Sequence, residues 1–307
     1  MKANRLVTPV VAVVGLLLLT GLATQVLAQG LGVPVYSHTA AAEKKLRASA
    51  EKLRAAGKLV SDGGLTNQLN RKSCDLKLPP ARTTRLSSRE LWSVARTAHL
   101  RVGWYYLCTK CNQRHLNLAA GYAVAANGAV ATCYHVVASP ENMREGNLVV
   151  ADENGDVFPV TEILAANQAL DVCLLHVTGG SFKPLPLQTE VYPGDRCVCF
   201  SDPLGERGYF SEGIVSRFLT PRPSRDDTNA PPKASRSGEE ATRLNVTTDW
   251  APGSSGAAVL DESGNVIGHV TAIATLGDQG KRRAGPTLIT LHEAVSAHDV
   301  LSLIRQP

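Results

Sequence analysis

The sequence predicts a mainly β protein preceded by a helical extension. Helix formers crowd the first third of the 307 residues, whereas short β-branched runs separated by tight turns fill the remainder. Hydrophobic residues make up 44% of the chain, which is enough for a sizeable core. Turns such as Asn127-Gly128 and Ser263-Gly264 join the runs, so we expect an all-β barrel or sandwich rather than a parallel sheet.

The N-terminus has the pattern of a cleavable signal peptide. Lys2 and Arg5 precede an apolar run from Val10 to Leu19, and a small-residue cleavage pattern ends at Ala28. The run is shorter than the roughly 20 residues that cross a bilayer, which disfavours the alternative of a retained anchor. We therefore predict that residues 1–28 are removed and that the mature protein is secreted or periplasmic.

Residues 29–100 are predicted to form a basic extension with helical and irregular parts. Thr39–Ala56 has charge pairs at four-residue spacing but a thin apolar stripe, so we expect a loosely docked helix or a linker, followed by irregular chain. A second helix is better specified, because Ser87 and Glu90 have the spacing of a capping box before an apolar face.

The charge of the chain is divided between this basic arm and an acidic body. Residues 29–116 hold 16 Lys and Arg against 5 Asp and Glu, whereas residues 117–307 hold 14 against 22. The arm either packs its basic faces near the acidic body or contacts a membrane or cell-wall surface. We predict no nucleic-acid partner, because no aromatic interleaving or nucleic-acid motif accompanies the basic residues.

Eleven short runs after Leu116 are predicted as strands, and Ala294–Ile304 is predicted as a closing helix. The predicted strands are 121–126, 129–137, 148–151, 157–164, 170–177, 196–200, 213–218, 244–248, 257–260, 266–273 and 286–290.

Three of these segments hold the residue types of a nucleophilic hydrolase. His135 stands near the end of one predicted strand, Asp171 lies within an apolar strand, and Ser255 lies on a glycine-flanked turn. A serine hydroxyl needs a histidine to remove its proton and a buried carboxylate to hold that imidazole. We therefore predict His135, Asp171 and Ser255 as the catalytic residues, with no metal or organic cofactor in the chemistry.

The presence of glycine near Ser255 is explained by the backbone conformation that this turn needs. Gly253 allows the backbone to curl so that its own N–H and that of Ser255 point to one place. Two such donors would form an oxyanion hole, so we predict that the amides of Gly253 and Ser255 bind the developing negative charge.

Together these segments resemble those of trypsin-like serine peptidases of the chymotrypsin fold, in particular the HtrA/Deg branch. The resemblance covers about Ala119 to Ile304 and is carried by Gly121–Val137, Leu170–Leu175, Asp202–Gly205, Glu212–Ser216, Pro252–Gly256 and Val266–Ile273. It implies a domain over residues 101–307 with two six-stranded antiparallel β-barrels, at about 101–185 and 190–307. It also implies that Ser255 is the nucleophile, His135 the general acid/base and Asp171 its orienter. No PDZ domain is expected.

We predict a serine endopeptidase that cleaves protein or peptide substrates through an acyl-enzyme. The alternatives are a non-catalytic binding or scaffold module on the same barrels, and a zinc-braced interaction protein. Asp249 stands six residues before Ser255, where a trypsin-like pocket holds a carboxylate for Arg or Lys. The HtrA resemblance favours a small aliphatic residue at P1 instead. The sequence predicts no oligomeric state.

The chain has seven cysteines, so at least one remains unpaired if disulfides form within an exported chain. Cys108, Cys111 and His115 have metal-ligand spacing, and Cys74 would complete a Cys₃His zinc site. A disulfide among Cys74, Cys108 and Cys111 is the alternative, because export favours oxidation. The other four lie in strand patterns and are predicted to be buried small hydrophobes: Cys133, Cys173, Cys197 and Cys199.

Overall fold

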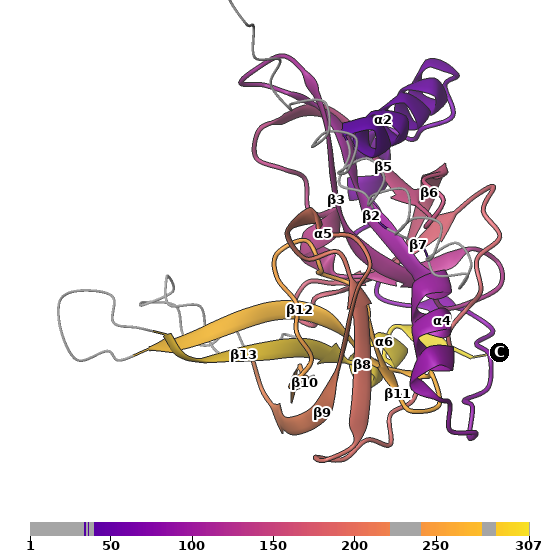
Figure 1. Cartoon of the computed structure of the whole chain (residues 1–307). Helices are drawn as coiled ribbons and strands as arrows, with labels where there is room; N and C mark the ends of the chain where they lie inside the picture. The colour runs from indigo at the N-terminus through magenta and orange to yellow at the C-terminus, as the bar shows by residue number, and fades with distance from the viewer. Residues whose placement is uncertain (1–33, 35, 37–39, 222–240, 278–286, 307) are drawn as a thin grey trace, which may run out of the picture. The chain divides into compact units, whose positions relative to one another are not determined.

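The computed structural model describes residues 34, 36, 40–221, 241–277 and 287–306 (Figure 1). Most of these residues form two closed six-stranded β-barrels with the helices that accompany them. The chain divides into two units, Met1–His38 and Thr39–Pro307, and both barrels lie in the second. The predicted mainly β fold with two antiparallel six-stranded barrels is confirmed. The predicted signal peptide lies outside the described residues. None of the described helices has the length and apolar character to span a membrane.

The first barrel has the strand order β2-β3-β4-β7-β6-β5, and every neighbouring pair is antiparallel. Its most apolar strand, β7, pairs with β4 and β6 and buries all but one of its residues, which explains its nearly continuous apolar sequence. The strands are β2 His99–Cys108, β3 Arg114–Ala123, β4 Ala129–Thr132, β5 Met143–Ala151, β6 Val157–Asn167 and β7 Val172–Val177.

The second barrel has the order β10-β13-β12-β11-β8-β9 and is likewise antiparallel throughout. Its core includes Leu244, Val259 and Ile267, together with Ala120 from the first barrel. The strands are β8 Arg196–Ser201, β9 Tyr209–Leu219, β10 Arg243–Val246, β11 Ala258–Asp261, β12 Val266–Gly277 and β13 Thr287–Ser296.

The described part of the extension before the barrels contains three helices: α2 Ala40–Ala55, α3 Asp62–Thr66 and α4 Ser88–Ala98. α2 lies against the first barrel, where Ala50 is buried with Tyr105 and Val149. The Tyr105 hydroxyl also donates to Glu51 at 2.6 Å. The expectation of a loosely docked helix is wrong, because the small Ala50 lets the helix approach β2 and β5 closely. The sequence did not predict α3.

The capping box at the start of α4 is confirmed, with the side chains of Ser87 and Glu90 satisfying each other's backbone amides. The closing helix is shorter than predicted. β13 continues through Ala294 and Val295 to Ser296, and α6 spans only Ala297–Leu301. After it, β14 Ile304–Arg305 pairs in parallel with β1 Cys74–Asp75, which fastens the extension to the end of the chain.

Candidate active site

His135 lies on a single helical turn, α5 Tyr134–Val137, directly after β4. The predicted strand through Val137 is therefore too long, since β4 ends at Thr132. Val136 and Val137 are buried in the first barrel and anchor the turn, whereas the His135 side chain is 49% exposed. The fold thus holds the backbone of this histidine and leaves its ring open to solvent.

Asp171 does not lie within a strand as predicted; it ends the turn between β6 and β7. Its φ is 56°, a left-handed conformation that aspartate tolerates better than most residues. Asn167 Oδ1 accepts hydrogen bonds from the amides of Ala169 (3.0 Å) and Leu170 (3.2 Å), which shapes this turn. The sharp turn aims the carboxylate toward α5.

The structure brings His135 and Asp171 together. His135 Nδ1 lies 3.1 Å from Asp171 Oδ1 and 3.0 Å from Oδ2, and the His135 amide donates to Oδ1 at 3.1 Å. Burial alone would raise the pKa of Asp171, but the hydrogen bond and charge of His135, with a further bond from Thr271, lower it to about 2. A carboxylate that stays ionised can hold the imidazole with its Nδ1–H toward Asp171.

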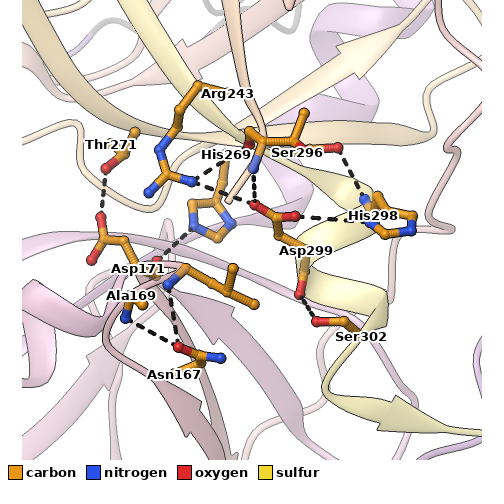
Figure 2. Close-up of polar contacts among 12 residues, drawn as sticks. Asn167, Ala169, Asp171, Arg243, His269, Thr271, Ser296, His298, Asp299 and Ser302 are labelled. Carbon is orange, nitrogen blue, oxygen red and sulfur yellow. Dashed lines mark hydrogen bonds and ion pairs between the residues drawn. The ribbon is translucent and has the colours of Figure 1, made fainter. Parts of the chain in front are cut away.

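Two residues of β12 in the second barrel complete the surroundings of Asp171 (Figure 2). The Thr271 hydroxyl donates to Asp171 Oδ2. The buried His269 places Nε2 3.4 Å from the Asp171 carbonyl and Nδ1 3.4 Å from the Tyr122 hydroxyl. Burial lowers the pKa of His269 to about 4, so the ring is neutral, with Nε2–H donating to Asp171 and Nδ1 accepting from Tyr122. Sequence reasoning found the strand but missed both roles.

Ser255 lies on the turn that enters β11, and this turn is tied to both barrels. The Ala120 amide of β3 donates to the Ser255 carbonyl at 2.8 Å, and the Gly256 amide donates to Val270 of β12 at 2.8 Å. Gly256 has a φ of +87°, and a Cβ there would lie 2.2 Å from the Ala120 oxygen. Only glycine lets the turn approach β3 this closely.

The backbone amides of this turn differ in whether they have a hydrogen-bond acceptor. The Ser254 amide donates to the Ala251 carbonyl at 3.1 Å, but the amides of Gly253 and Ser255 donate to no acceptor among the described residues. Gly253 has a φ of +101°. Two flanking amides without an internal acceptor are what an oxyanion hole requires. This arrangement fits the predicted donors, Gly253 and Ser255.

The short helix η1 Pro203–Gly205 supports the turn from the second barrel. The Leu204 amide donates to the Pro252 carbonyl at 2.7 Å, and the Ser254 hydroxyl donates to Ser201 Oγ at 3.0 Å. Just before η1, the carboxylate of the partly buried Asp202 accepts from the Gly208 amide at 2.8 Å. These contacts fix the backbone on which the candidate oxyanion donors stand.

The Asp202 carboxylate also reaches the first barrel. Its Oδ2 lies 3.4 Å from His99 Nε2 and 3.9 Å from Arg101 Nε, both on β2. The Asp202 side chain is 13% exposed, and those of His99 and Arg101 are 6% and 8% exposed. The mid-chain motif is therefore an anchor between the barrels, a role that the sequence did not predict.

The hydroxyl of Ser255 makes no hydrogen bond to any described residue, the His135 ring included. Catalytic hydrogen bonds in unliganded enzymes are often long and tighten only when substrate is bound. Asp249 is exposed, and its backbone amide and carbonyl both bond to the Ser211 hydroxyl, at 3.1 and 3.0 Å. Its carboxylate thus stands at the surface.

Cys133 lies beside His135 and Asp171, and its thiol is of a chemical type that can act as a nucleophile, as the Ser255 hydroxyl is. One ligand atom from each of the three lies within 4.8 Å of the others, and Cys133 Sγ donates to the Val270 carbonyl at 3.0 Å. Burial, reinforced by the charge of Asp171, raises the pKa of the Cys133 thiol well above its ordinary value. A thiol held protonated is a poor nucleophile and a poor metal ligand.

Residues 119–268 match the family model of the trypsin-like peptidase domain. The matched segment begins in β3 and ends in β12, so it contains His135, Asp171 and Ser255. No curated protein matched the chain. The match and the two closed six-stranded barrels together support a chymotrypsin-fold protease and a serine protease-type function.

Proposed function

We propose that the protein is a serine endopeptidase in which Ser255 attacks the peptide carbonyl and His135 accepts the hydroxyl proton. The observation that carries the proposal is the ionised Asp171 bonded to His135 Nδ1, which leaves Nε2 as the proton acceptor. The amides of Gly253 and Ser255 would hold the oxyanion of the tetrahedral intermediate. His135 then returns the proton to the leaving amine, and water hydrolyses the acyl-enzyme.

The test is Ser255→Ala, with Ser216→Ala as the matched control because Ser216 is exposed on β9. We expect Ser255→Ala to lower kcat on casein on the order of 10⁴- to 10⁶-fold and to abolish labelling by a fluorophosphonate. The Ser216→Ala variant keeps both. Fluorophosphonate labelling that persists in Ser255→Ala would refute the nucleophile assignment.

We further propose that the enzyme is of the HtrA/Deg type and prefers a small aliphatic residue at P1. The motif resemblance supports this preference, whereas a trypsin-like preference would use the exposed carboxylate of Asp249. Cleavage of a peptide library by the mature protein separates the two. Dominant cleavage after Arg or Lys that disappears in Asp249→Ala would contradict the aliphatic preference without touching the triad.

A further inference from the structure

The turn between β2 and β3 gathers three metal-ligating side chains in a group separate from Cys133, His135 and Asp171. Cys108 is the last residue of β2, Cys111 lies in the turn, and His115 is the second residue of β3. Cys108 donates its amide to Gln113 at 2.9 Å and accepts from the Asn112 amide at 3.1 Å. Asn112 has a φ of 56°, so the chain reverses sharply and folds back on itself.

The ligand atoms are close enough for one metal ion. One atom each from Cys108, Cys111 and His115 lies within 4.8 Å of the others, and Cys111 Sγ is 3.0 Å from His115 Nε2. Tetrahedral zinc, with bonds of about 2.3 Å to sulfur and 2.0 Å to nitrogen, separates two sulfurs by about 3.8 Å and sulfur from nitrogen by about 3.5 Å. The Cys111–His115 separation is therefore about half an ångström shorter than zinc requires, and Cys111 is exposed on its turn.

Hydrogen-bond donors already surround the buried sulfur of this group. The Lys110 amide donates to Cys108 Sγ at 3.4 Å, and Asn142 Nδ2 donates to it at 3.3 Å. Donors of this kind orient and stabilise a ligating thiolate. By contrast, the thiols of Cys173 and Cys197 are buried within strands, where burial raises their pKa.

Cys74 does not belong to this group. It lies in β1 beside β14, and its Sγ contacts the Leu303 carbonyl at 3.7 Å. The predicted Cys₃His set with Cys74 as a ligand is therefore wrong. No fourth Cys, His, Asp or Glu joins the group among the described residues, so solvent remains for the fourth position.

We propose that Cys108, Cys111 and His115 bind one zinc-class divalent ion, with water as the fourth ligand. Binding replaces the two thiol protons, which pass to solvent, and involves no change of oxidation state. The turn also bonds to the residue before β5, because the Thr109 amide donates to the Asn142 carbonyl at 2.8 Å. The ion would thus brace the hairpin against the segment that follows α5.

The test uses reduced, chelator-treated full-length protein and measures bound metal directly. We expect one Zn²⁺ per chain, thiolate-to-metal charge-transfer absorption with Co²⁺, and a higher unfolding midpoint with Zn²⁺. Cys111→Ser and His115→Ala should lose all three, and both side chains are outside the core, so folding is preserved. Cys74→Ser is the matched cysteine control and should retain them.

A second control separates this site from the candidate active site. His135→Ala removes a member of the Cys133, His135 and Asp171 group and should still bind one ion. Loss of metal in His135→Ala, or its retention in Cys111→Ser, would overturn the proposal. So would a reduced protein that takes up no Zn²⁺ while the protein purified without reductant carries a Cys108–Cys111 disulfide.

Discussion

Replacing Asp202 with Asn removes the carboxylate that joins the first barrel to the loop supporting the turn that carries Ser255. Burial would raise the pKa of Asp202, but the hydrogen bond and charge of His99, with help from Gly208 and Arg101, lower it to about 2 from an ordinary value of 3.8. At about 1.4 kcal/mol for each pH unit, this difference corresponds to about 2 kcal/mol of stability at pH 7.

The direction of the pKa shift determines the pH range in which this stabilisation is lost. Because the folded-state pKa of Asp202 is lowered, its stabilisation is complete above about pH 4 and declines as the pH falls through 2. At pH 2 it amounts to about 0.4 kcal/mol. Urea unfolding of wild type and Asp202→Asn should therefore differ by about 2 kcal/mol at pH 7 and by much less at pH 2.

Asp156→Asn is the matched control, because Asp156 is exposed and should show no such difference. Asp202→Asn should also lower kcat more than it raises KM, since the turn carrying the candidate oxyanion donors rests on this loop. A stability difference that is the same at pH 7 and pH 2 would refute the ion-pair explanation.

Two further substitutions test the supports of the site. Gly256→Ala should destabilise the fold by about 2 kcal/mol or more and abolish activity, because its Cβ meets the Ala120 oxygen at 2.2 Å. Gly194→Ala, with positive φ but nothing within 4 Å, should cost less in thermal unfolding; equal costs would contradict the steric explanation. Thr271→Val should lower kcat about tenfold through loss of a charge-assisted bond, whereas the exposed Thr275→Val should not. An unchanged kcat in Thr271→Val would remove Thr271 from the site.

Local sequence was sufficient for the features that depend on neighbours along the chain. The capping box of α4 follows from Ser87 and Glu90. Short β-branched runs indicate most strands of both barrels, although β2 was not among the predicted strands. Local pattern gave a wrong prediction where one short apolar run continues from a strand into a helical turn. The run containing His135 reads as one strand, yet the chain leaves the sheet after Thr132 and Tyr134–Val137 forms α5.

Contacts between distant segments could not be predicted from local pattern. Asp202 and His99 are separated by 103 positions, and nothing near either residue indicates the other. Asp171 reads as a strand residue because apolar residues flank it, but the Asn167 side chain shapes a turn after β6, and β7 begins only at Val172. The predicted role of Cys74 as a metal ligand was wrong for the same reason, because the position of Cys74 is set by the pairing of β1 with β14 at the C-terminal end.

A bulge in β12 explains how one strand serves both halves of the site. Val270 pairs with Ala294 and Ala272 with Glu293, so Thr271 is an extra residue without a partner on β13. The Val270 carbonyl accepts from the Gly256 amide of the turn that carries Ser255, while the Thr271 hydroxyl donates to Asp171 of the first barrel. Without the bulge, the alternation of a regular strand would shift every later side chain of β12 to the opposite face. The extra residue therefore sets the position of Asp171 relative to the turn that carries Ser255.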